Sequence, residues 1–253
     1  MQSIARSFSL KHLVGPLSHS YFNWNLITSL ALPAPKYPRS FDDLGQHIGH
    51  TNLPDLVRQY LDADASDTDL PSTSPQSTCP YAEHLKVFHS ARAIFCAPSN
   101  PSAITGMYHE TIRAMPSWNR GEIPGPRYDF IFVSNGLSSD PGMGGLLDAH
   151  ALLFFSFTID GEFHQCALIH WFSTFGNQPD SDNGMWVVTP DYSGARCNVS
   201  VIHIDSIVRA AHLLPIFDQQ TLPHTLNYTK TLDSFQGFYV NKYIDYHAYE
   251  AVF

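Results

Sequence analysis

Hydrophobic residues in the second half of the chain come in short runs separated by turn-forming residues. Runs rich in β-branched and aromatic residues cover residues 128–134, 151–159, 163–172, 185–189 and 198–204. Runs of this length, divided by Gly, Pro and Asp, predict five short antiparallel strands. Further upstream, a similar run over residues 85–97 is interrupted near Ser90, which predicts a strand that turns there.

The pair Asp160-Gly161 lies between the second and third of these strands and is typical of a two-residue type I′ hairpin turn. Such a turn fixes the register, because the residues on either side of it face each other across the hairpin. The expected opposed pairs are Phe157 with His164, Phe155 with Cys166, Leu153 with Leu168, and Ala151 with His170. Both faces of the hairpin are then largely apolar, so we expect both to be covered by other parts of the chain.

Three segments near the strands have helical features. Asp205 has the character of an N-cap and predicts a short helix over residues 206–214. A short helix is also compatible with residues 108–114. Aromatic residues three and four positions apart predict a helix over residues 232–251, which we expect to cover one outer face of the sheet.

Together these elements predict an α+β fold that is mainly β: a small antiparallel barrel of SH3-like or BAH-like type with flanking helices. We place this barrel in residues 81–253. We expect residues 1–80 to be poorly ordered except for a short helix over about residues 52–61, which Asn52 and the proline after Leu53 begin. The Asp, Ser, Thr and Pro residues of the segment 62–80 predict a linker before the barrel.

The charge of the chain limits its partners. The formal net charge is −9, from 14 Lys and Arg and 23 Asp and Glu. A general nucleic-acid binder needs a basic surface to displace counterions from phosphate, so we do not expect broad nucleic-acid binding. A local contact remains open through arginines in or beside the near-neutral middle segment. These are Arg92, Arg113, Arg120 and Arg127.

The N-terminus carries no secretory signal, and no apolar run approaches the roughly 20 residues of a membrane span. We therefore expect an intracellular protein, nuclear or cytoplasmic, with no membrane partner. The first 40 residues are basic and rich in serine, as in a mitochondrial presequence, but their prolines prevent a long helix and favour a tail. The sequence leaves the oligomeric state open.

The most distinctive stretches of the chain are FHSARAIFCAPSNPSAITGMYHETIRAMPSW followed by YDFIFV, and the long stretch from GMWVVTPDYSG to FYVNKYIDYHAYE. They resemble a segment that recurs in hypothetical proteins of basidiomycete fungi. This segment is similar to the C-terminal part of proteins encoded by Plavaka and related CACTA-like transposons, and the resemblance covers about residues 50–253. It implies a solo or truncated copy derived from a mobile element, and it carries over no catalytic residue.

Histidine and cysteine side chains on the central hairpin form a candidate metal site. His164, Cys166 and His170 alternate onto one face, and His203 lies on a nearby strand. Such nitrogen and sulfur ligands suit Zn²⁺. The register, however, places them opposite apolar residues, where a cysteine usually acts as a small hydrophobic side chain. We therefore predict no metal and no cofactor.

A metal-dependent nuclease or transposase-related enzyme is the alternative function. Asp129, Asp205 and Glu250 follow one another in an order that suits acidic ligands for divalent ions in the RNase H-like class. That class has a helix between its third and fourth strands. The corresponding connection here is STFGNQPDSDNG, a turn-forming stretch without a helical period.

The function we favour is that of a non-catalytic accessory or interaction module with a protein or peptide partner. Small barrels often bind peptides in grooves lined by aromatic residues, although this is an analogy of fold. The aromatic residues in or beside loops are Trp118, Tyr128, Trp186 and Tyr192. The acidic loop 180–182 suits a basic partner. Each of these aromatic residues also fits a core position.

Overall fold

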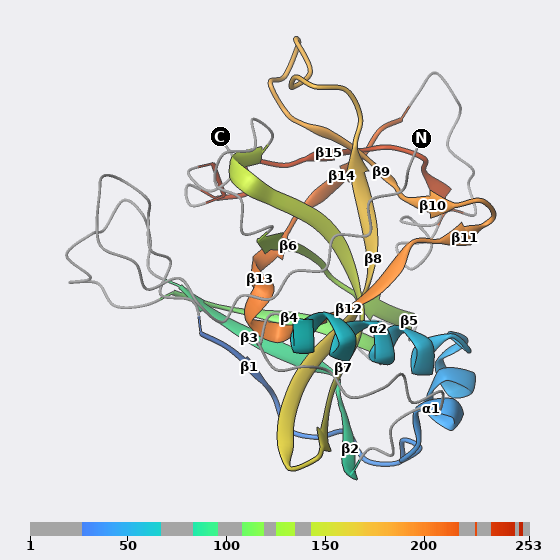
Figure 1. The fold of residues 1–253 in the computed structure, drawn as a ribbon. Helices are drawn as coiled ribbons and strands as arrows, with labels where there is room; N and C mark the ends of the chain where they lie inside the picture. The colour runs from blue at the N-terminus through green and yellow to red at the C-terminus, as the bar shows by residue number, and fades with distance from the viewer. Residues whose placement is uncertain are drawn as a thin grey trace.

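The computed structural model of this 253-residue chain describes residues 27–66, 83–95, 108–118, 125–134, 143–217, 226, 234–245 and 248–249. These residues form two α-helices, two short 3₁₀ turns and many antiparallel strands (Figure 1). The fold is therefore mainly β, which confirms the predicted fold class. Most of the strands are arranged around one long hairpin.

This central hairpin consists of β7 (Leu146–Ile159) and β8 (Glu162–Thr174). The two residues of its turn have φ values of 52° and 82°, as a type I′ turn requires. The predicted register is confirmed from the turn as far as the pair of Leu153 with Leu168.

Beyond this pair the register shifts between Ala151 and Leu153, so that His150 lies opposite His170. The predicted pair of Ala151 with His170 is therefore wrong. Leu152 is an extra residue in β7, and such a β-bulge is not visible in the alternation of polar and apolar residues.

One end of the hairpin belongs to a nearly closed barrel, in the strand order β13-β6-β7-β8-β9-β15-β14. The first and last strands of this order, β13 (Ile207–Ala211) and β14 (Leu213–Pro215), are separated by one residue in the sequence. The two edges of the sheet therefore lie close together. The remaining strands are β6 (Phe130–Ser134), β9 (Val187–Pro190) and β15 (Phe238–Val240). The barrel core contains Phe130, Phe132, Met143, Phe172, Trp186, Val188, Val208, Leu213, Phe238 and Val240.

A second sheet has the order β1-β3-β4-β5 and packs against one face of the hairpin. Its strands are β1 (Ile27–Leu30), β3 (Ser90–Phe95), β4 (Tyr108–Trp118) and β5 (Gly125–Tyr128). Small inner residues, Ala91, Ala93 and Ala114, allow this sheet to approach Phe154 and Ile169 of the hairpin closely.

Four shorter strands and two 3₁₀ turns complete the described structure. β2 (Glu83–Phe88) pairs with β7, and β12 (Val199–His203) pairs with β8. β10 (Tyr192–Ser193) and β11 (Arg196–Cys197) form a small exposed hairpin. The 3₁₀ turns are η1 (Met143–Gly145) and η2 (Ile204–Ser206). The break between β2 and β3 at His89 confirms the predicted turn near Ser90.

Two helices, α1 (Phe41–Ile48) and α2 (Leu53–Ser66), cover the other face of the hairpin (Figure 1). Ser40 caps α1 by accepting the backbone N–H of Asp43 at 3.2 Å. Phe41 packs edge-on against Phe157. Both faces of the hairpin are thus covered, as predicted, but by N-terminal helices instead of a C-terminal one.

Two of the segments with helical features are strands in the structure, and the third contains a strand among its described residues. Residues 206–214 form β13 and part of β14, residues 108–114 lie in β4, and residues 238–240 of the predicted C-terminal helix form β15. Over such short segments a spacing of three and four residues does not separate helix from strand. Here pairing with distant strands decides, because β13 pairs with β6 and β15 with both β9 and β14.

The N-terminal residues contribute more structure than the sequence indicates. The predicted helix over 52–61 is confirmed but continues to Ser66, so the first residues of the predicted linker are helical. β1 and α1 were not predicted, and both pack against the strands. The rest of the linker and residues 1–26 lie outside the described residues, and the domain boundary at residue 80 stays a prediction.

Candidate functional site

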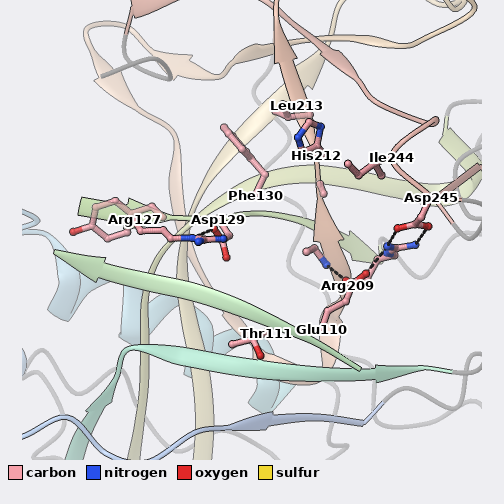
Figure 2. Close-up of a pocket in the computed structure, with 13 residues that line it drawn as sticks. Glu110, Thr111, Arg127, Asp129, Phe130, Arg209, His212, Leu213, Ile244 and Asp245 are labelled. Carbon is pink, nitrogen blue, oxygen red and sulfur yellow. Dashed lines mark hydrogen bonds and ion pairs between the residues drawn. The ribbon is translucent and has the colours of Figure 1, made fainter. Parts of the chain in front are cut away.

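A cavity of about 400 Å³ lies beside the barrel where β4, the junction of β5 and β6, the β13–β14 segment and residues 244–245 meet (Figure 2). Its lining mixes charged groups with aliphatic ones. It consists of Glu110, Thr111, Arg127, Tyr128, Asp129, Phe130, Arg209, Ala210, Ala211, His212, Leu213, Ile244 and Asp245.

Arg209 of β13 lies at the centre of this arrangement, with its side chain only 3% exposed. Its guanidinium donates to both carboxylate oxygens of Asp245, at 3.1 and 2.7 Å, and also to Oε1 of Glu110 (Figure 2). The second oxygen of Glu110 accepts the backbone N–H of Ala210 at 3.0 Å. Burial by itself lowers the pKa of Arg209, but the hydrogen bond with Asp245 and the charge of Glu110 outweigh it and raise that pKa.

A β-bulge determines where Arg209 points. The register of β13 against β6 shifts between Ile207 and Arg209, and Arg209 is paired with Phe132. Val208 takes the position in the barrel core, while the guanidinium of Arg209 reaches Glu110 and Asp245. Bulges commonly redirect a side chain in this way.

Asp129 forms the opposite wall, between β5 and β6. Its Oδ1 accepts a hydrogen bond from Nε of Arg127 at 2.9 Å. Its Oδ2 accepts a hydrogen bond from the backbone N–H of Arg113, also at 2.9 Å. Its own backbone N–H donates to the carbonyl of Arg113, and its carbonyl accepts the N–H of Ala151. Asp129 therefore joins the second sheet to the barrel sheet.

The segment after β15 supplies the remaining wall. Lys242 donates to the carbonyl of Gly184 at 2.6 Å, and the hydroxyl of Tyr243 donates to the carbonyl of Asn183 at 3.1 Å. The amide of Asn241 lies 3.1 Å from Nδ1 of His212, whose pKa is lowered by burial. These contacts hold Ile244 and Asp245 at the edge of the cavity.

The charges at the cavity differ in their exposure. The guanidinium of Arg209 is almost fully buried, whereas the side chains of Glu110, Asp245 and Asp129 are 24%, 38% and 18% exposed. Arg127, at 39%, is the partly exposed cation of the lining. Three carboxylates and one guanidinium thus face solvent at the cavity, which suits a ligand with a positive charge.

The three predicted partner-binding residues whose side chains are described do not converge. Tyr128 lines the cavity, half-buried, with its ring edge-on to that of His150 at 5.9 Å between centroids. Tyr192 is 55% exposed on β10. Trp186, just before β9, is 6% exposed in the barrel core and offers no binding surface. Trp118 ends β4, and its side chain lies outside the described structure.

The candidate zinc ligands also have other roles. Cys166 is fully buried, which raises the pKa of its thiol. The ring of His164 stacks on that of Phe157, and Nε2 of His170 lies 2.9 Å from the carbonyl of Asp191. Among the described residues, no group of three His, Cys, Asp or Glu side chains is arranged to hold a metal ion.

The nuclease hypothesis stays a prediction, because Glu250 lies outside the described residues. Of its other two acids, Asp129 is bound by Arg127 and by backbone, as described above. Asp205 is 65% exposed and lies 3.4 Å from Nδ1 of His203.

The sequence did not identify Arg209, Glu110 or Asp245 as site residues. One signal was present: Arg209 interrupts an otherwise apolar stretch, where a charge needs a buried partner. Its partners are 99 and 36 residues away along the chain, so their identity was not readable.

Asp148 is a second buried ionisable residue. It lies on β7, which pairs with the edge of β6 opposite to β13. It is 0% exposed and lies opposite Phe132. Within the described structure its two carboxylate oxygens have no hydrogen-bond partner. Burial raises the pKa of Asp148 to about 8.

Comparison with known proteins adds no relative: no protein family, no curated protein and no solved structure matches the chain. Neither of the two helices in the described residues has the length and apolar character needed to cross a membrane.

Proposed function

We propose that this chain is a non-catalytic interaction module whose cavity binds a positively charged side chain of a protein partner. The carboxylates of Glu110, Asp129 and Asp245 at a cavity of about 400 Å³ support this proposal, because the guanidinium of Arg209, which pairs with Glu110 and Asp245, lies buried beneath them. A lysine or arginine side chain has the charge and the apolar stem to fit this mixture of carboxylates and aliphatic residues.

The overall charge supports the same partner. The net charge of −9 favours basic over acidic partners, and it speeds their encounter at low salt, where the charge is least screened. The aliphatic side chains of Leu213 and Ile244 at the cavity give the stem of a basic residue an apolar contact. The affinity then depends on both parts, charge and apolar contact.

A binding role, not catalysis, follows from how the carboxylates are used. Glu110 and Asp245 hold Arg209, and Asp129 holds Arg127 and a backbone N–H. Carboxylates engaged in ion pairs of this kind position strands and are poorly placed to move protons.

The resemblance to transposon-encoded fungal proteins gives this module a setting. We propose an accessory protein derived from a mobile element, with an SH3-like or BAH-like barrel, that acts in the nucleus or cytoplasm. The nearly closed antiparallel barrel is compatible with either type of barrel.

A calorimetric titration with a lysine- and arginine-rich peptide and with a glutamate-rich peptide of equal length tests the binding role. We expect the basic peptide alone to bind. Ile244→Lys places a positive charge at the cavity, so it should weaken that binding about tenfold, or 1.4 kcal/mol. Ile244 is 49% exposed, so folding should tolerate the change.

Leu32→Lys is the matched control, since Leu32 is 87% exposed and does not line the cavity. This variant should bind the basic peptide as the unchanged protein does. Equal affinity for the two peptides, or equal loss in both variants, would contradict the proposed function.

A further inference from the structure

The four-stranded sheet β1-β3-β4-β5 has an outer face that adjoins the cavity: its residues Thr111 and Arg127 also line the cavity, and Asp129 binds Arg127. The strand register defines this face. Ser29 lies opposite Arg92, which lies opposite Thr111; Ser90 lies opposite Arg113; and Met115 lies opposite Arg127. Opposed residues in antiparallel strands point to the same side of a sheet. The intervening residues, including Ala91, Ala93 and Ile112, are buried against the hairpin.

The outer face is basic. Three adjoining strands each contribute one arginine: Arg92 on β3, Arg113 on β4 and Arg127 on β5. Strands β3 and β5, on either side of β4, lie about 10 Å apart. Among the described residues that point outward from the four strands there is no Asp or Glu. Asp129, just after β5, is the nearby carboxylate, and it holds Arg127 at 2.9 Å beside Arg113.

Hydroxyl groups accompany the arginines. Ser29, Ser90 and Thr111 occupy outward positions in the same rows as Arg92 and Arg113. Arginine guanidinium and serine or threonine hydroxyl groups are among the side-chain donors that contact nucleic-acid phosphates.

We infer that the outer face of the β1-β3-β4-β5 sheet binds the phosphate backbone of a nucleic acid. Donors on three adjacent strands fit an extended single strand, and backbone contacts of this kind carry no sequence preference. The net charge of −9 does not prevent this local contact, since at physiological salt charges more than about 8 Å away are largely screened.

Fluorescence anisotropy with a labelled oligothymidine tests this inference, with a labelled duplex and a labelled polyglutamate peptide as the other arms. Three phosphate contacts on a single strand predict that log K falls with log salt with a slope of about −2. Binding should therefore weaken clearly between about 50 and about 200 mM salt. Tighter binding of the duplex would support the phosphate contact and identify its source.

Arg92→Gln is the most informative variant, because Arg92 is exposed and its removal disturbs no packing. It should weaken oligothymidine binding several-fold and reduce the salt slope by about 0.7. Arg196→Gln, at an exposed arginine of the β10–β11 hairpin, is the matched control and should change neither value.

Two results would overturn the inference. One is the absence of oligonucleotide binding at low salt, whether or not polyglutamate binds. The other is an equal effect of Arg92→Gln and Arg196→Gln, which would show that the contact does not involve this face. Thermal unfolding of both variants should match that of the unchanged protein, so that loss of binding is not loss of fold.

Discussion

Arg209 and Asp148 show two ways in which this fold treats a buried charge. Both lie opposite Phe132, Arg209 on β13 and Asp148 on β7, so they occupy one row across the barrel sheet with a single residue between them. Arg209 turns out of the barrel at a bulge and is bound by two carboxylates. Asp148 has no partner in the described structure and stays neutral by keeping its proton.

The difference shows that proximity in a sheet does not make an ion pair. Residues on strands two apart are separated by about 10 Å, and the bulge adds a change of direction. Arg209 keeps its charge because Glu110 and Asp245 come from outside the barrel to meet it. Asp148 lies opposite Phe132, and no described residue donates a hydrogen bond to its carboxylate.

The largest expected effect concerns Asp148 and pH. The folded-state pKa of about 8 lies above the value of about 3.9 for an unfolded chain. The stability linked to this proton is therefore fully present below about pH 4 and is lost as pH rises through 8. The free energy of unfolding should fall by about 1.4 kcal/mol per pH unit between those values.

Urea denaturation at several pH values, for the unchanged protein and for Asp148→Asn, measures this effect. The variant cannot ionise at this position, so its stability should exceed that of the unchanged protein increasingly towards pH 8. Asp42→Asn, at an exposed residue of α1, is the control and should follow the unchanged protein. Parallel curves for all three proteins would show that Asp148 is solvated or paired.

The second effect concerns Arg209. Arg209→Met keeps most of the volume but leaves Glu110 and Asp245 without their cation, which should cost about 3 kcal/mol. The midpoint of urea denaturation measures this loss. Arg92→Met, at an exposed position, should change stability by less than about 0.5 kcal/mol. Similar losses in the two variants would remove the distinction between the buried and the exposed arginine.

The smallest effect concerns His212, which lines the cavity beside Arg209 and Asn241. Because burial lowers the pKa of His212, the folded protein binds this proton less well than the unfolded chain does. Stability should therefore fall as pH falls below about 6.5, opposite in direction to the effect of Asp148. His212→Gln should make the acid side of the pH profile shallower, and an unchanged acid side would contradict this assignment.

The sequence predicted the parts of the fold that depend on neighbouring residues. The turn at Asp160-Gly161 and the alternation on either side of it determine the hairpin and most of its register. The bulge at Leu152 was not predictable, because the alternation of polar and apolar residues does not mark an extra residue in a strand. Strand β15 was mistaken for helix, because its partners Val187 and Val188 lie far away in the sequence.

The candidate site was less predictable than the fold. Tyr128 was identified from its place beside a loop, and it does line the cavity. Asp129 was read as a possible metal ligand, whereas its oxygens hold Arg127 and a backbone N–H. The carboxylates that define the cavity come from β4 and from the segment after β15, and only folding brings them to Arg209.

The barrel closes where β13 and β14 meet, and only one residue separates these two strands. This arrangement affects the order in which the strands can pair during folding. The central hairpin pairs residues joined by a two-residue turn, so it can form within microseconds. Closing the barrel instead pairs β13 with β6 and β14 with β15, which are distant along the chain. Such long loops cost entropy before their contacts form. We therefore expect the hairpin to form first and the pairing of β13, β14 and β15 to be the slow step of folding.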